Sequence, residues 1–163
     1  MRVTTAALVV SALSVAPVSS SLEPRRVEQI VALQAFGPVP ACPGGPAGSR
    51  VLNLQRLPNG ASRPFAIPAG HALVITDFSW IVRGAAPDRL TWAALAITLG
   101  GGYNGVSHVF ARTDADGAVV VNRSLREGLV VAQGHELCVI QEISASSFVE
   151  FAEAHGYLVR VAP

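Results

Sequence analysis

The sequence contains no lysine, and only 14% of its 163 residues are charged. All twelve basic residues are arginine, which is typical of a gene from a GC-rich bacterial genome. The net charge is +1 and no stretch is strongly basic, so nucleic acid is not an expected partner. Half of the residues are apolar, which excludes a disordered chain and predicts one globular domain, with or without a tail.

The sequence also lacks an apolar run that could cross a bilayer. The N-terminal run, residues 6–18, has about 13 residues, whereas a membrane helix needs about 20. It follows Arg2 and precedes small residues, which is the pattern of a secretory signal peptide. We expect residues 1–21 to be a signal peptide, the protein to be secreted or periplasmic, and no stable membrane span to remain after cleavage. An uncleaved N-terminal anchor is the alternative.

Cysteine is scarce, with two residues in the whole chain, Cys42 and Cys138. In an exported protein an even pair usually forms a disulfide. Cys42 lies in a segment rich in proline and glycine, and Cys138 lies in a predicted strand, so the bond would tie that segment to a sheet. The alternative is two separate thiols, with Cys138 as a small core residue.

The proline and glycine residues suggest how the chain is divided. Four prolines and four glycines within residues 37–48 exclude regular structure there. Residues 22–36 favour either a short helix or a loose first strand. We therefore expect a flexible N-terminal arm with a Pro/Gly-rich loop over residues 22–48, and the main domain over residues 49–163.

Convincing helical periodicity is missing from the main domain, where short apolar and alternating stretches are separated by turn signals. The predicted strands cover residues 51–57, 64–67, 72–82, 91–99, 106–112, 118–122, 129–132, 136–143, 147–152 and 156–161. Asn59-Gly60, Asn104-Gly105 and Asp116-Gly117 are favoured hairpin dipeptides. Strands of this length and spacing predict an all-β fold, a two-sheet antiparallel β-sandwich with a jelly-roll-like topology. An open barrel is the alternative.

The longest predicted strand, residues 72–82, is the best candidate for the centre of the fold. Phe78 and Trp80 lie on one face, with Val74 and Val82 at the same parity, whereas Asp77 points the other way. We expect both aromatic side chains in the core between the sheets. A slip of one residue would bury Asp77, which sets the register.

The beginning of this strand recurs 64 residues later in the chain. Residues 65–75, FAIPAGHALVI, align with residues 129–139, LVVAQGHELCV, with Gly, His and Leu in register. This repeat predicts two related strand–turn–strand units. The turn at 68–71 resembles a fragment of the second motif of cupins, which are jelly-roll proteins. That motif has its metal-binding histidine where this chain has Leu73, so no metal ligand is carried over.

Several motifs are incomplete in ways that exclude their usual chemistry. Residues 100–105 match G-x-G-x-x-G, but residues 106–112 predict a strand instead of the helix that a dinucleotide site needs. We expect a Gly-rich loop there, with Tyr103 and Asn104 as candidate ligand-facing residues. The sequence 114–117, DADG, lacks the later glutamate of a calcium loop and predicts a hairpin turn.

Catalytic and metal motifs are absent as well. The four histidines are too far apart in sequence for a local metal motif, no nucleophile elbow occurs, and the carboxylates are scattered. We expect no enzyme activity, no metal and no cofactor. The expected function is a non-catalytic binding module for a carbohydrate, an envelope component or a protein. The alternative is a structural or assembly subunit of a secreted or cell-surface complex, and homo-oligomers stay open.

Exposed side chains would discriminate between these functions. Carbohydrate binding needs flat exposed aromatic rings, and the candidates are Trp80, Trp92, Tyr103 and Tyr157. A large exposed apolar face would favour assembly instead.

Overall fold

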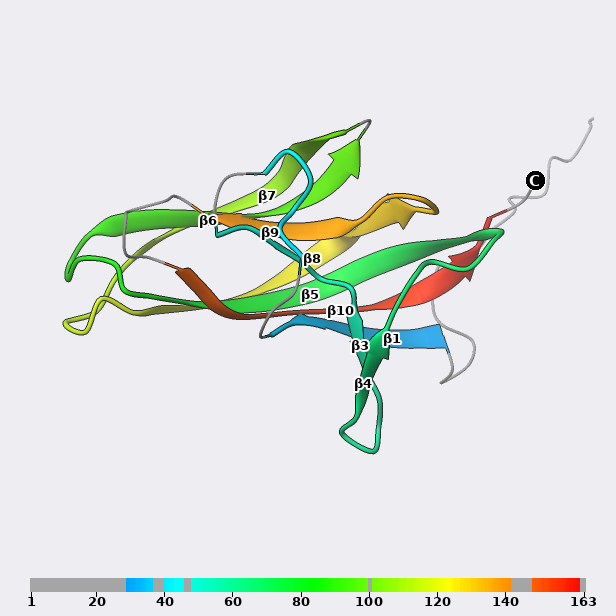
Figure 1. The fold of residues 1–163 in the computed structure, drawn as a ribbon, viewed down its shortest axis with the longest axis horizontal. Coiled ribbons are helices and arrows are strands. Elements are labelled where there is room, and N and C mark those ends of the chain that lie inside the picture. The colour runs from blue at the N-terminus through cyan, green and yellow to red at the C-terminus, as the bar shows by residue number, and fades with distance from the viewer. Residues whose placement is uncertain (1–28, 37–39, 46–47, 100, 142–147, 162–163) are drawn as a thin grey trace, which may run out of the picture.

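A computed structural model shows that the described residues form strands and no other regular element (Figure 1). The residues that it describes are 29–36, 40–45, 48–99, 101–141 and 148–161. The signal peptide predicted at residues 1–21 lies outside these ranges. The strands are β1 (Ile30–Ala35), β2 (Arg50–Val51), β3 (Leu54–Arg56), β4 (Ser62–Pro64), β5 (His71–Arg83), β6 (Leu90–Leu99), β7 (Gly102–Arg112), β8 (Val119–Ala132), β9 (Leu137–Gln141) and β10 (Phe148–Arg160).

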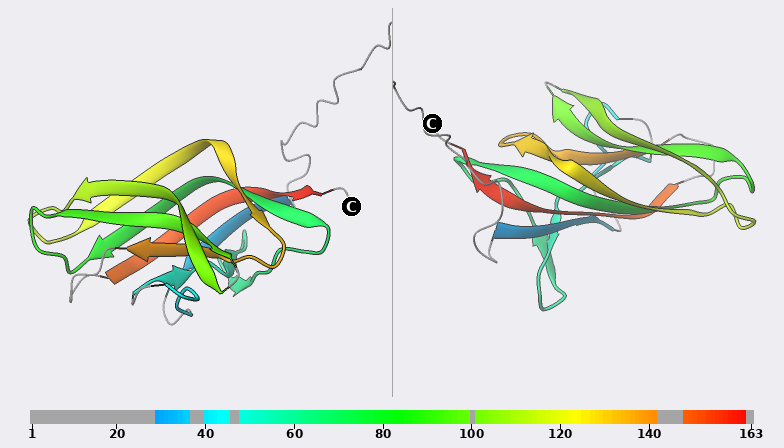
Figure 2. Two further views of the ribbon diagram at one scale, coloured as in Figure 1. Left: turned by 90° about the horizontal axis from the view of Figure 1, so that it is seen from above. Right: turned by 180° about the vertical axis from the view of Figure 1, so that it is seen from behind.

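The strands form two sheets that lie over one another as separate layers (Figures 1 and 2). The strand order is β4-β3-β1-β10-β5-β8 in the six-stranded sheet and β2-β9-β6-β7 in the four-stranded sheet. Every strand pair is antiparallel. One buried cluster, the inter-sheet core, includes Trp80 of β5 and Leu95 of β6, so it joins the two sheets. The predicted all-β fold with two antiparallel sheets is confirmed, and the arrangement of the two layers is sandwich-like.

The two aromatic residues of β5 lie in this inter-sheet core, as predicted. Phe78 is 3% exposed and Trp80 is 1% exposed. Their rings stack with centroids 4.8 Å apart. Large buried aromatic side chains dominate the energetics of a core of this size, so this pair is a main determinant of the fold.

A β-bulge in β5 nevertheless changes which residues of the strand share a face. Thr76 has no partner in the ladder with β10, so the alternation of side chains reverses there. Before the bulge, Leu73 and Ile75 belong to the inter-sheet core, and Val74 lies on the opposite face; after it, Phe78 faces the core. The predicted common face of Val74 and Phe78 is therefore wrong, because an extra residue shifts the side-chain period of two.

Two pairs of predicted strands are in fact single long strands. The strands predicted at 118–122 and 129–132 fall on β8 (Val119–Ala132), and those predicted at 147–152 and 156–161 fall on β10 (Phe148–Arg160). A glycine marks the irregular part of each strand. Gly128 has a φ of 69° where the pairing of β8 with β5 is interrupted, and Gly156 lies so close to the backbone of Val74 that a Cβ atom would collide with it. Glycine thus marks bulges and close approaches here, and the strands continue through them.

The predicted strand 51–57 is divided between the sheets. Its first part is β2 in the four-stranded sheet and its last part is β3 in the six-stranded sheet, so the chain crosses between the layers at Asn53. In place of the strand predicted at 64–67, the structure has β4 at Ser62–Pro64. The Asn59-Gly60 dipeptide forms the predicted hairpin turn between β3 and β4, with a φ of 83° at Gly60.

The other two turn dipeptides differ from expectation. Asn104-Gly105 lies inside β7, where the pairing with β6 is irregular, so the hairpin predicted there is wrong. Gly101, with a φ of 88°, lies between the two strands instead. Asp116-Gly117 forms a turn closed by a 3.1 Å bond from the Gly117 N–H to the Asp114 carbonyl, but it joins β7 to β8 in the other sheet and is not a hairpin.

Part of the expected N-terminal arm is a strand of the sandwich. β1 lies between β3 and β10 in the six-stranded sheet. Val31, Leu33 and Ala35 alternate with more exposed residues and are all buried in the inter-sheet core. The strand alternative is therefore the correct one for residues 30–35, and the sandwich begins before residue 49, because this alternating apolar face contributes to the core.

Candidate functional site

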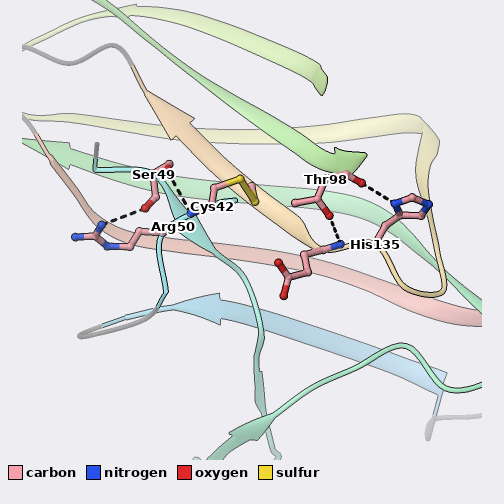
Figure 3. The surroundings of a disulfide bond; sticks show 7 residues. Cys42, Ser49, Arg50, Thr98 and His135 are labelled. Atoms are coloured by element: carbon pink, nitrogen blue, oxygen red, sulfur yellow. Dashed lines mark hydrogen bonds between the residues drawn. A yellow bond between two sulfur atoms is a disulfide. The ribbon is translucent and has the colours of Figure 1, made fainter. Parts of the chain in front are cut away.

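The two cysteines lie at disulfide distance and attach an irregular segment to the four-stranded sheet (Figure 3). The described residues of this covering segment are 40–45 and 48–49. The sulfur atoms of Cys42 and Cys138 are 2.17 Å apart and the Cα atoms 5.8 Å apart, across a sequence separation of 96 residues. Beside them, the Cys42 N–H donates to Oγ of the fully buried Ser49 at 3.3 Å. The Gly45 N–H donates to the Cys42 carbonyl at 2.8 Å. The predicted pairing of the cysteines is supported, and the segment is held by both covalent and hydrogen bonds.

This segment covers part of the outer face of the four-stranded sheet and creates a second buried cluster, which we call the disulfide core. Its members are Cys42, Val51, Ala94, Ala96, Cys138 and Ile140. The two alanines project from β6 on the side opposite Leu95, which faces the inter-sheet core. Small side chains let the covering segment approach the strand closely, which explains the alternation of large and small residues in β6.

Beyond the disulfide core the same face carries three aromatic side chains, which we call the aromatic strip: Trp92, His108 and Phe110. Trp92 packs against the disulfide core and is partly buried. The centroid of its ring is 5.8 Å from that of exposed His108, with the planes tilted by 47°. Phe110 is the cross-strand partner of Trp92 and is 64% exposed. The strip is therefore an open aromatic surface on two paired strands.

A pair of exposed, oppositely charged side chains lies at one end of the aromatic strip. Arg112 is opposite Leu90 and donates from Nη1 to the Asp88 carbonyl at 2.8 Å and to Asp88 Oδ1 at 3.4 Å. The link that carries Asp88 is held by buried Thr113, whose Oγ1 accepts from the Arg89 N–H at 3.0 Å. Apolar rings and planar polar groups are thus presented together by backbone that is already ordered.

The structure separates the four aromatic residues that the sequence offered as candidates. Trp80 is in the inter-sheet core, Trp92 is in the strip, and Tyr157 lies in β10. Sequence reasoning missed Phe110 and His108. Their shared parity in the predicted strand 106–112 was a usable signal, but no sequence feature shows that this strand pairs with the one that carries Trp92.

The predicted ligand-facing residues Tyr103 and Asn104 lie in a strand, and no loop contains them. They form part of β7, opposite Thr98 and Ile97. Both are exposed, Tyr103 by 39%. They lie on the same strand as Phe110, nearer to the Gly101 turn. Their contact with a ligand stays a prediction.

A separate polar network occupies the outer face of the six-stranded sheet. Ser124 Oγ donates to Asp77 Oδ1 at 2.6 Å. This bond is the main reason why the pKa of Asp77 lies below its ordinary value. A hydrogen bond with Thr76 and the nearby His155 also lower this pKa, whereas partial desolvation raises it. His155 Nε2 lies 3.2 Å from Glu153 Oε1. Because the pKa of Asp77 is lowered, its carboxylate is a weak general base for the Ser124 hydroxyl.

The remaining histidines serve as turn residues. Nδ1 of His71 lies 2.9 Å from the Ala69 carbonyl. Nδ1 of His135 lies 2.6 Å from the Thr98 carbonyl, as Figure 3 shows. Because a carbonyl only accepts, each of these nitrogens carries the proton. Within the described ranges, no three His, Cys, Asp or Glu side chains come together in a way that could hold a metal ion.

Across the described part of the chain, the structure contains no helix with the length and apolarity of a membrane span. No protein-family model matches the sequence, and no curated protein matches it.

Proposed function

We propose that the protein is an exported, non-catalytic binding module that holds a carbohydrate against the aromatic strip. The observation that carries this proposal is the 64% exposure of Phe110 directly opposite Trp92. The C–H face of a sugar ring is apolar and packs on a flat aromatic ring, which removes apolar area of both partners from water. The neighbouring Arg112 and Asp88 supply a donor and an acceptor for hydroxyl groups.

The strand order supports a jelly-roll topology for this module. Without the β3–β4 hairpin, the sheets reduce to β1-β10-β5-β8 and β2-β9-β6-β7. Each set interleaves early strands with late ones, and the chain passes between the layers after β1, β2, β5, β7, β8 and β9. Two four-stranded sheets with such crossings are the pattern of two Greek keys wound together.

Export is part of the same proposal. The N-terminal sequence has the signal-peptide pattern, and a cysteine pair at disulfide distance is suited to an oxidising compartment, either outside the cell or in the periplasm. The intact mass of protein recovered from an export-competent host should show the loss of about 20 residues, as signal cleavage requires. A full-length mass would contradict export and would leave the binding proposal to its own test.

Binding is tested with the mature protein on a glycan array, followed by titration of the best glycan. Replacement of Phe110 by alanine should weaken binding about tenfold, which equals about 1.4 kcal/mol. Val120→Ala is the matched control, because Val120 is 62% exposed but lies on the six-stranded sheet. Equal losses in both variants, or no glycan bound at all, would contradict the proposal.

Tryptophan fluorescence locates the bound sugar. The chain has two tryptophans, Trp80 in the inter-sheet core and Trp92 in the strip. Sugar binding should change the emission of the wild type and leave that of Trp92→Phe unchanged, because the remaining Trp80 is 1% exposed. A response that persists in Trp92→Phe would place the sugar elsewhere.

An assembly subunit is the second candidate function, favoured by an apolar row across the outer face of the six-stranded sheet. Ile30 pairs with Tyr157, Tyr157 with Val74, and Val74 with Val130. Ile30 and Val130 at the two ends are 55% and 56% exposed. If this row is an interface, light scattering should give an oligomer that Val130→Asp converts to a monomer.

A further inference from the structure

A cavity lies at one end of the sandwich, between the two copies of the repeated sequence. Its volume is about 380 Å³. Three links form its walls: the one between β2 and β3, the one between β4 and β5, and the one between β8 and β9. The apolar side chains that line it are Val51, Leu52, Phe65, Ala66, Ile67, Leu73, Val131 and Leu137. The first copy of the repeat supplies four of these and the second copy supplies two, so the repeat has a structural consequence.

The two repeated turns have the same backbone geometry. The His71 N–H donates to the Pro68 carbonyl at 3.1 Å, and Gly70 has a φ of 69°. In the second copy, the His135 N–H donates to the carbonyl three residues before it at 3.2 Å, and Gly134 has a φ of 82°. Positive φ at the third residue of such a turn favours glycine, which is why both copies contain it.

The walls of the cavity are tied together by hydrogen bonds within the chain. The Leu52 N–H donates to the Leu137 carbonyl at 2.8 Å, and the Phe65 N–H donates to the Asn53 carbonyl at 2.7 Å. The Glu136 N–H donates to Thr98 Oγ1 at 2.8 Å. The cavity is therefore formed in advance, and a ligand would not have to order a loop on entry.

The polar groups around the cavity favour one sign of ligand charge. Glu136 is the carboxylate of the lining, and no arginine belongs to it. His135 already uses Nδ1 in its bond to Thr98. Asn53 Oδ1 is buried at the wall and accepts no hydrogen bond from the described residues. The formal charge of the lining is therefore that of the Glu136 carboxylate, which is exposed at the rim, so a cation fits this lining better than an anion.

We propose that this cavity is a second ligand site, which takes a small primary amine carried on an apolar body. A dry protein cavity of about 150 Å³ holds one benzene molecule, so a volume of this size takes about ten to fifteen non-hydrogen atoms. The apolar body would lie between Phe65 and Leu73, and the ammonium group would face Glu136. The site is independent of the aromatic strip and of the function proposed for it.

The test compares three probes that share a phenyl ring: 2-phenylethylamine, 2-phenylethanol and phenylacetate. They are titrated at about pH 8, where an ordinary imidazole is neutral, into the mature protein labelled with ¹⁵N. The amine should shift the amide signals of Phe65, Gly134 and Glu136 and bind at least about tenfold tighter than phenylacetate, because charge-assisted hydrogen bonds are the stronger ones. Equal affinity for phenylacetate, or no shifts at the cavity up to about 10 mM probe, would overturn the proposal.

Two variants with matched controls complete the test. Glu136→Gln should lower the affinity for the amine to that for the alcohol, whereas Glu127→Gln, an exposed carboxylate of β8 outside the cavity lining, should change nothing. Phe65→Ala should weaken all three probes, with the signals of β5 and β6 retained as evidence of folding. An unchanged amine affinity in Glu136→Gln would overturn the charge assignment. Phe110→Ala should leave amine binding intact, which separates this site from the aromatic strip.

Discussion

The inter-sheet core and the disulfide core of this protein are built in different ways. The inter-sheet core is formed by the inner faces of both sheets and contains the large side chains Phe78, Trp80 and Leu95. The disulfide core is smaller and lies on the outer face of one sheet, beneath a segment that Cys42 attaches. The first follows from strand alternation, and the second depends on a crosslink between distant residues. The fold therefore depends on the inter-sheet core, and the support of the aromatic strip depends on the disulfide core.

The largest expected effect comes from truncating the inter-sheet core. Trp80→Ala should lower the free energy of unfolding by about 3–5 kcal/mol, as other large-to-small changes of buried aromatic residues do. The reason is its 1% exposure and its stacking on Phe78. Urea unfolding followed by circular dichroism measures this change. A loss below about 1 kcal/mol would show that the inter-sheet core does not control stability.

Removal of the disulfide tests the disulfide core. Cys42→Ser should lower stability by about 2–4 kcal/mol, because the bond closes a long loop; the chain-entropy model gives roughly 4–5 kcal/mol as an upper figure. Strand content should stay nearly unchanged, and the emission of Trp92 should move to longer wavelength as the covering segment leaves it more exposed.

Two measurements check this second prediction. Non-reducing peptide mapping of exported wild-type protein should recover Cys42 and Cys138 in one linked peptide pair, and two free thiols would contradict the bond. The emission of Trp80, measured in a Trp92→Phe background, is the control and should not respond to Cys42→Ser. A response of Trp80 would mean that the two cores are coupled.

Two neighbouring alanines of β6 allow each core to be perturbed separately, with a smaller expected effect. Ala94 is in the disulfide core and Ala93 is in the inter-sheet core, and both are almost fully buried. Replacement of either by leucine should cost about 1–3 kcal/mol through overpacking. Ala94→Leu should lift the covering segment and change the emission of Trp92, whereas Ala93→Leu should change that of Trp80. Identical spectral responses in both variants would contradict two separate clusters.

Sequence patterns predicted most of the inter-sheet core and little of the candidate site. The parity of Phe78 and Trp80 predicted their burial, because side-chain alternation and hydrophobicity are both local. The bulge at Thr76 was not predictable, because it arises from the ladder with β10, some eighty residues away. The same limit applies to Phe110, whose position beside Trp92 depends on strand pairing.

The covering segment shows a different limit of sequence reasoning. The content of proline and glycine predicted an irregular segment, and the cysteine count predicted its attachment. The burial of Ser49, and the packing of Cys42 in one cluster with Ala94 and Ala96, could not be predicted, because irregular backbone has no side-chain period that relates sequence to a face. The alanines on one side of β6 were the available signal for close packing, and they did not reveal which segment packs there.

The smallest expected effect comes from a region that belongs to neither core. The Ser124 hydrogen bond lowers the pKa of Asp77, so the folded state holds its charged form more strongly than the unfolded chain does. This contribution to stability is present above the unfolded pKa of about 3.9 and is lost as the pH falls through the lower pKa of the folded state. Because Asp77 lies near the surface, the contribution should be below about 1 kcal/mol. Asp77→Asn should therefore lower the melting temperature slightly at pH 7 and leave it unchanged at pH 2. Asp116→Asn, which removes an exposed turn carboxylate, is the control. A loss above about 2 kcal/mol at pH 7 would make the outer face of the six-stranded sheet a third determinant of stability, beside the two cores.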